Sequence, residues 1–314
     1  MISPFLSLYI EKTHLLPDKF LPENAFVCSV PTCCVQIEDL SVLFPAFLRR
    51  RPASLLRCNV EYVFLITQEL RLDPLAAYHA IELLQRFMVK HLTGLLTTPT
   101  PEGAGAAAAL TESSEEAVLE KIKDTFPLIV FSCVQLASKL SLHSHMIDNN
   151  TAVRFLHSVG LSVSKQTLLD SELMVLKGLE FRLNAPNPLT YVEILLEVLG
   201  HNEPSIPVEH LHLLCHQVLQ FVSLQRTAIY DSLLVTTTRC VSPSREHRET
   251  FVTVTEDCML LGVGVIAVAT FIHYFKNWQQ VVGELSHITG ISKRSISDFV
   301  HVTLAHIVRT SCSL

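Results

Sequence analysis

Hydrophobic residues recur along this chain with the 3.6-residue period of amphipathic helices. The clearest example begins at Asp73-Pro74, where Asp73 is suited to cap a helix and Pro74 to occupy its first position. Its apolar face consists of Leu75, Tyr78, Ile81, Leu84, Phe87 and Met88. No strand-like alternation of useful length occurs. The pattern therefore predicts an all-α protein.

Two nearly all-apolar segments, 126–140 and 257–275, are each predicted to form the central helix of a separate bundle. The 18 residues from Cys258 to Phe275 are near the lower length limit for a membrane span. A buried helix explains this segment as well, and we favour burial because other helices of the chain are almost as apolar. We expect no membrane partner.

The remaining pattern divides the chain into three regions. Residues 1–54 form an N-terminal extension with a short helix that stops or kinks at Pro45. Residues 55–186 form the first bundle, with a mobile insertion at 97–117 that is rich in proline, glycine, alanine and serine. Residues 187–314 form the second bundle, which contains a polar loop at 236–256.

Composition and charge exclude several classes of protein. Hydrophobic residues make up 49% of the chain and charged residues 17%, which favours a large core over global disorder. A net charge of −6 argues against direct nucleic-acid binding. The cluster Arg49-Arg50-Arg51 is interpreted as a solvated helix end. Nine cysteines, an odd number without a secretory leader before them, indicate a reducing compartment.

Two charged residues lie on otherwise apolar helix faces. Ser132, Gln135 and Lys139 form one narrow polar stripe in the first central segment. Glu172 interrupts an apolar row made of Leu168, Val175 and Leu179. A buried carboxylate requires a partner, because burying a charge alone costs several kcal/mol. Alternatively, Lys139 is a helix-end lysine stabilised by the helix dipole, and Glu172 is solvated at the edge of a bundle.

The surrounding motifs resemble the cyclin family. LASK, which contains Lys139, is followed by a polar connection and by LLDSELMVLKGLEFRLNAPNPLTYVEIL, and this set resembles the first cyclin box. Upstream, the segment ELRLDPLAAYHAIELLQRFM ends in an arginine–phenylalanine pair, Arg86-Phe87, as in cyclins. The resemblance covers roughly residues 55–198. It implies two tandem cyclin-like helical bundles of five helices each, the second divergent.

The resemblance also implies a partner-binding site. Lys139 and Glu172 match the cyclin lysine and glutamate that face the partner kinase and bind backbone groups around its regulatory helix. Both should be partly exposed and within reach of an ion pair. The apolar part of the same interface is expected at Leu140, Leu176, Phe181 and Leu183.

The sequence also departs from the cyclin pattern at two places. Leu56 and Gln85 stand where cyclins carry an arginine and an aspartate in a buried ion pair, and only the neighbouring Arg57 could replace that arginine. The apolar patch and tryptophan that dock substrates in cyclins are replaced by Arg57, Cys58, Asn59 and Tyr62. These departures weaken the case for substrate docking.

Two functions are consistent with these residues. The resemblance, to a divergent cyclin associated with meiotic crossover formation, implies a nuclear, chromosome-associated protein, with the cytoplasm as a second location. It would bind a cyclin-dependent kinase through the first cyclin box and direct it at crossover-designated sites, together with meiotic crossover proteins. The alternative is a kinase-independent adaptor that assembles recombination proteins on a cyclin-fold scaffold.

Other motifs are weaker. His212 and His216 are spaced at i, i+4 as in some zinc sites, but no second ligand pair is evident, nor is one near His143 and His145, so we predict no metal site and no cofactor. The sequence contains no phosphate-binding glycine loop and no nucleophile motif, which argues against an enzyme. Ser242, in Ser-Pro-Ser-Arg, is a candidate proline-directed phosphorylation site.

Overall fold

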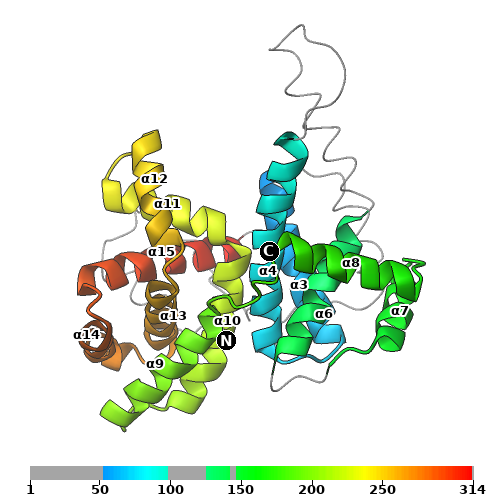
Figure 1. Cartoon of the computed structure of the whole chain (residues 1–314). Coiled ribbons are helices and arrows are strands. Elements are labelled where there is room, and N and C mark those ends of the chain that lie inside the picture. The colour runs from blue at the N-terminus through cyan, green and yellow to red at the C-terminus, as the bar shows by residue number, and fades with distance from the viewer. Residues whose placement is uncertain (1–51, 98–124, 142–145, 313–314) are drawn as a thin grey trace, which may run out of the picture. The chain divides into compact units, whose positions relative to one another are not determined.

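The computed structural model describes residues 52–97, 125–141 and 146–312, and all regular structure in these ranges is helical (Figure 1). The all-α prediction is confirmed over this part of the chain. The short helix expected before Pro45, the Arg49-Arg50-Arg51 cluster and positions 98–117 of the expected insertion lie outside the described residues. His143 and His145 do so as well.

The chain divides into two compact units at Asn187–Pro188. In its described residues the first unit contains α3 (Pro52–Glu69), α4 (Pro74–Thr97), α6 (Phe126–Leu140), α7 (Asn149–Ser158) and α8 (Lys165–Gly178). The second contains α9 (Pro188–Asn202), α10 (Val208–Leu224), α11 (Arg226–Thr238), α12 (Arg245–Thr255), α13 (Cys258–His273), the 3-10 turn η2 (Phe275–Asn277), α14 (Trp278–Thr289) and α15 (Lys293–Cys312).

In the first unit, α6 is the central helix. It packs against α3, α4 and α8, and its residues from Ile129 to Ser138 are all buried. At the start of α4, Asp73 Oδ1 accepts a hydrogen bond of 2.7 Å from the Leu75 N–H, and Pro74 is the first helical residue. Both the predicted central helix and the predicted helix start are confirmed.

In the second unit, α13 is the central helix. It packs against α9, α10, α14 and α15, and its residues from Leu260 to Phe271 are all buried. The predicted burial of this apolar segment is therefore confirmed. In the described ranges no helix on its own is long and apolar enough to cross a membrane; α12 and α13 meet that requirement only as a pair, and they are bent by 74° at their junction.

The second unit differs from the expectation at residues 236–256. In place of one polar loop, α11 continues to Thr238 and α12 begins at Arg245. The Ser244 hydroxyl caps α12 by accepting from the His247 N–H over 3.2 Å. No residue of α12 is buried. The second unit thus has seven α-helices in its described residues, rather than the five that the resemblance implied.

Candidate functional site

An ion pair joins the end of α6 to the middle of α8. Lys139 Nζ donates to Glu172 Oε1. The lysine side chain is 31% exposed, whereas that of the glutamate is 9% exposed. The expected ion pair is therefore confirmed, but the expectation that Glu172 is partly exposed is wrong. Glu172 is buried because its face of α8 packs against α6, and Lys139 supplies the partner that the buried carboxylate requires.

The rest of the polar stripe on α6 fixes the position of the neighbouring helices. The hydroxyls of Ser132 and Ser171 share a hydrogen bond of 2.8 Å; Ser132 lies about two turns before Lys139 on α6, and Ser171 directly precedes Glu172 on α8. Gln135 Nε2 donates to Asn149 Oδ1 over 3.0 Å, at the start of α7. Both serines are buried, so the bond between them holds one register of α8 on α6. In that register Glu172 lies opposite Lys139.

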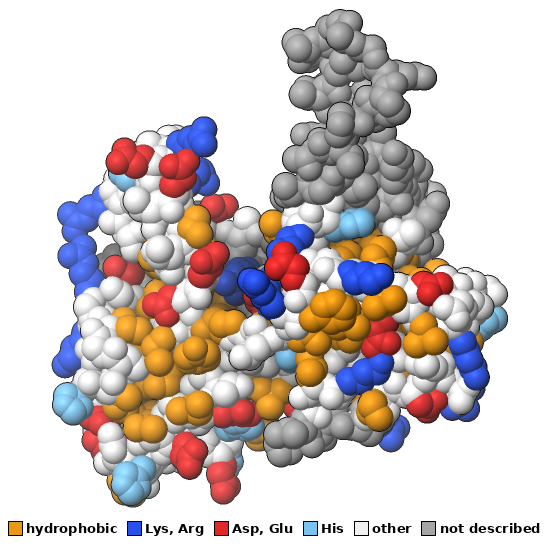
Figure 2. All heavy atoms as spheres, viewed as in Figure 1, with side chains coloured by type: hydrophobic (Ala, Val, Ile, Leu, Met, Phe, Trp, Pro, Cys, Tyr) orange, Lys and Arg blue, Asp and Glu red, His pale blue; other side chains and the backbone are white. Residues whose placement is uncertain are grey.

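The helices and turn near this ion pair in the sequence carry exposed and half-buried apolar side chains. Phe181 is 63% exposed, Leu140 is exposed, and Leu176 and Leu183 are half-buried. On the first unit, Figure 2 shows hydrophobic side chains interspersed with charged ones in the region of α8. Monomeric proteins seldom gather several large apolar side chains on one exposed face unless that face contacts another molecule.

Two members of this surface were missed in the sequence. Leu169 and Leu173 of α8 are 41% and 42% exposed. They form a row at i, i+4 and i+7 with Leu176, separate from the buried row that contains Glu172. A short helix that packs on one side needs only one apolar row. The second apolar row on α8 is therefore the sequence signal that could have identified Leu169 and Leu173 as surface residues. We use the term apolar surface for Leu140, Leu169, Leu173, Leu176, Phe181 and Leu183.

A strained turn places Phe181 outside the unit. Glu180 and Phe181 have φ angles of 54° and 58°, in the left-handed region. This conformation costs a non-glycine residue about 1–2 kcal/mol. The Phe181 N–H donates to the Leu176 carbonyl oxygen over 2.9 Å, and Lys90 of α4 pairs with the Glu180 carboxylate at 2.9 Å. These contacts hold the turn and keep the aromatic ring in solvent.

The segment after this turn is bound to α4 through its backbone. Arg86 donates to the Arg182 carbonyl oxygen over 2.9 Å, and His79 Nε2 donates to that of Leu183 over 2.8 Å. The arginine of the Arg86-Phe87 motif thus holds the extended segment, while Phe87 is buried in the core. The backbone of half-buried Leu183 is thus tied to α4.

The departures from the cyclin pattern have different outcomes. Gln85 is half-buried on α4, and the side chains of Leu56 and Arg57 lie outside the described residues, so the replacement of the ion pair stays a prediction. Tyr62 is buried in α3, and burial raises the pKa of its hydroxyl to about 12. It is therefore a core residue and does not line an exposed docking groove.

Ser242 lies in the exposed bend between α11 and α12, two residues before the Ser244 cap. The Arg245 guanidinium that follows it pairs with Glu249 at 2.7 Å. The serine is accessible to a modifying enzyme, and its phosphorylation stays a prediction.

The sequence of the chain is similar to those of known proteins. No family model matches the chain. Two similar proteins share the description cyclin N-terminal domain-containing protein 1. The one from Mus musculus is 42% identical over 249 residues, which cover 79% of this chain and 74% of that protein. The one from Homo sapiens is 42% identical over 247 residues, with the same shares of the two chains.

Proposed function

Because this chain belongs to the family of cyclin N-terminal domain-containing protein 1, we propose that it is a non-catalytic regulatory subunit that binds a cyclin-dependent kinase. The observation that carries this proposal is the Lys139–Glu172 ion pair, which joins α6 and α8, the two helices that carry four of the six residues of the apolar surface. Polar groups amid exposed apolar area suit a protein interface, since the polar groups fix orientation and the apolar area drives association.

Lys139 can bind a partner protein while it remains paired with Glu172. An ammonium group carries three N–H donors, and one of them is used in the ion pair. The exposed part of the lysine can donate to backbone carbonyl oxygens of a docked helix. The buried carboxylate holds the ammonium in place before the partner arrives, which lowers the entropy lost on binding.

Binding would regulate the kinase by increasing the fraction of kinase molecules in the active conformation. A subunit that binds only the active position of a kinase helix favours that position by its binding free energy. Moving a kinase from 1% to 99% active requires a differential binding energy of about 5.5 kcal/mol. Burying the exposed parts of four to six apolar side chains, at about 1 kcal/mol each, is of that order.

The finer role that we propose is in meiotic recombination. The kinase complex would act in the nucleus, on chromosomes, at crossover-designated sites, and other crossover proteins would bind beside it. This role is supported by the sequence resemblance to a divergent meiotic cyclin. A net charge of −6 favours recruitment through proteins over direct contact with DNA.

A kinase-independent adaptor is the second candidate function. Two residues favour it. Buried Tyr62 stands where cyclins carry the tryptophan that docks substrates, and neutral Gln85 stands where they carry the aspartate of a buried ion pair. In that case the apolar surface would bind a recombination protein in place of a kinase.

The two functions are separated by co-purification with a panel of cyclin-dependent kinases. Phe181→Asn removes the most exposed ring of the apolar surface, and asparagine tolerates the left-handed backbone. Lys139→Ala combined with Glu172→Ala removes both polar groups without leaving a buried charge unpaired. Val241→Asn is the matched control, because Val241 is strongly exposed in the second unit.

We expect wild type and Val241→Asn to form a stoichiometric complex with at least one kinase. The Phe181→Asn variant and the double variant should lose that complex while keeping their helical circular dichroism. Absence of a complex with every kinase would contradict the kinase proposal and leave the adaptor. A complex that both variants retain would contradict the assignment of the apolar surface.

A further inference from the structure

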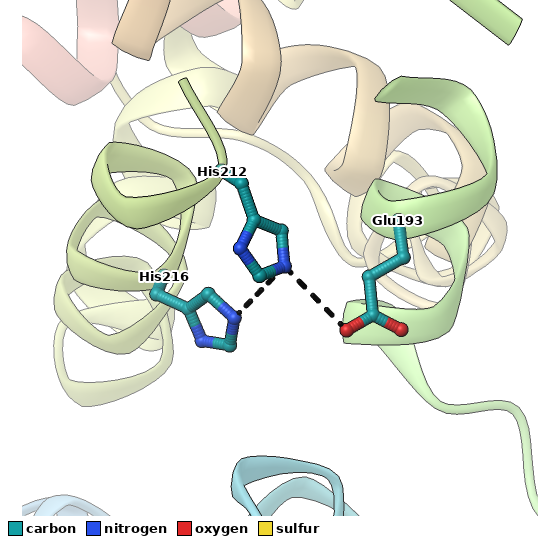
Figure 3. Close-up of side chains that lie close together, drawn as sticks. All are labelled: Glu193, His212 and His216. Atoms are coloured by element: carbon teal, nitrogen blue, oxygen red, sulfur yellow. Dashed lines mark hydrogen bonds and ion pairs between the residues drawn. The ribbon is translucent and has the colours of Figure 1, made fainter. Parts of the chain in front are cut away.

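Three side chains of the second unit converge between two helices. Glu193 extends from α9, and His212 and His216 extend from successive turns of α10 (Figure 3). His212 Nε2 lies 3.2 Å from His216 Nε2 and 3.6 Å from Glu193 Oε1. One donor atom from each residue lies within 4.8 Å of the other two.

Spacing in the sequence marks only two of the three residues of this cluster. The i, i+4 spacing places His212 and His216 on one face of α10, but the neighbouring Cys215 is buried in the core and does not join them. The third donor belongs to α9, which packs against α10. Glu193 is one of two glutamates in α9, and no motif around it in the sequence marks it as a ligand.

We propose that Glu193, His212 and His216 form a binding site for a zinc ion. Two imidazoles and one carboxylate are an established zinc ligand set. Around a tetrahedral zinc ion with bonds of about 2.0–2.1 Å, neighbouring donor atoms are about 3.3 Å apart. The distances of 3.2 Å and 3.6 Å that His212 Nε2 makes to His216 Nε2 and Glu193 Oε1 bracket that value. The third pair of donor atoms lies within 4.8 Å, so rotation of the side chains has to bring all three donors to the ion.

The cluster is also accessible and has the required protonation chemistry. All three residues are half-buried, so an ion can reach them without opening the core. Each histidine would bind through Nε2, which places its proton on Nδ1 and breaks the present hydrogen bond between the two rings. Three protein ligands leave a fourth position for water or for a donor from a bound protein.

The consequence for the fold is a cross-link between α9 and α10. A metal ion that binds the folded protein and not the unfolded chain raises the unfolding temperature as its concentration increases. Zinc would therefore stabilise the second unit. This inference is independent of the kinase-binding proposal, since the two sites lie in different units.

The test is a titration of the full chain with zinc chloride after treatment with a chelator, followed by calorimetry and by thermal unfolding. We expect one zinc site to require all three residues. Glu193→Gln and His216→Gln should each weaken zinc binding by more than about tenfold. Loss of a residue that only hydrogen-bonds a metal ligand already weakens binding by at least about that factor. Glu197→Gln and His210→Gln alter exposed residues of the same helices and should bind like wild type.

Cobalt substitution identifies the donor atoms. Cobalt bound to nitrogen and oxygen should give the visible absorption bands of a tetrahedral site without a thiolate charge-transfer band. In a separate measurement, zinc should raise the unfolding temperature of wild type but not that of Glu193→Gln. Absence of zinc binding would overturn the proposal. Equal affinity in wild type and in the Glu193→Gln and His216→Gln variants, or a thiolate band on cobalt, would overturn it too, because the ion would then be bound elsewhere.

Discussion

Phe87 of α4 lies directly against Gly178 of α8: a Cβ atom on Gly178 would be 2.6 Å from Cε2 of the phenylalanine ring. Carbon atoms that are not bonded to each other are normally about 3.5–4.0 Å apart. The last turn of α8, which leads into the strained turn at Phe181, can approach α4 this closely only because residue 178 has no side chain.

Gly178→Ala should therefore destabilise the first unit. The added methyl group has to displace the buried Phe87 ring, and overpacking of this kind costs about 1–3 kcal/mol. Gly283→Ala is the control, because its Cβ would meet only the flexible end of Lys293, at 3.4 Å, and alanine favours helix by up to about 1 kcal/mol. Urea unfolding measures the free energy of unfolding of both variants. Equal stability of Gly178→Ala and wild type would contradict the close packing.

Removing Lys139 alone should be more harmful than removing it together with Glu172. Lys139→Ala leaves a buried carboxylate without its partner, which we expect to cost about 1–3 kcal/mol. In the double variant Lys139→Ala, Glu172→Leu, no charge remains to be buried, so much of that loss should be recovered. A double-mutant cycle from denaturant unfolding gives the coupling energy. Additive effects of the two substitutions would contradict a buried ion pair.

Asp148 should make stability depend on acid pH. Its carboxylate caps α7, and hydrogen bonds from the backbone N–H and hydroxyl of Thr151, then from the Asn150 N–H, lower its pKa. A group whose pKa is lowered by folding stabilises the fold above its ordinary value of about 4. That contribution is lost as pH falls through the lower folded value.

Asp148→Asn keeps an effective cap without a titrating group. Its unfolding temperature should therefore fall less than that of wild type when thermal unfolding is repeated at decreasing pH, from near neutrality to below about pH 3. If the two proteins lose stability in parallel, the hydrogen bonds to Asp148 do not lower its pKa.

The cysteines should differ in reactivity. Cys133 and Cys215 are buried, and burial raises the pKa of both thiols. Cys240 and Cys258 are half-exposed. With iodoacetamide at neutral pH, the latter two should be alkylated first, and the buried pair only after the protein unfolds. Peptide mass spectrometry gives the order. Equal labelling of Cys133 and Cys240 in the folded protein would contradict the burial.

Several features of this protein could be predicted because they depend on neighbours along the chain. Nearly continuous apolar segments identified the central helices α6 and α13, and Asp73-Pro74 marked the start of α4. Glu172 could be recognised as needing a partner because it interrupts an apolar row, and helix geometry fixes which residues share a row. In contrast, α12 was expected to be part of a polar loop, because its segment is rich in charged and polar residues and contributes no buried side chain.

The sequence by itself therefore determined the helical class, the central helix of each unit and the need of Glu172 for a partner. Only the tertiary structure decided that Glu172 is buried, that Leu169 and Leu173 are exposed, and that Glu193 lies beside His212. The reason is physical. A helix sets the direction of its own side chains within a few residues, but which face meets which neighbour depends on the summed packing of many weak contacts between distant segments.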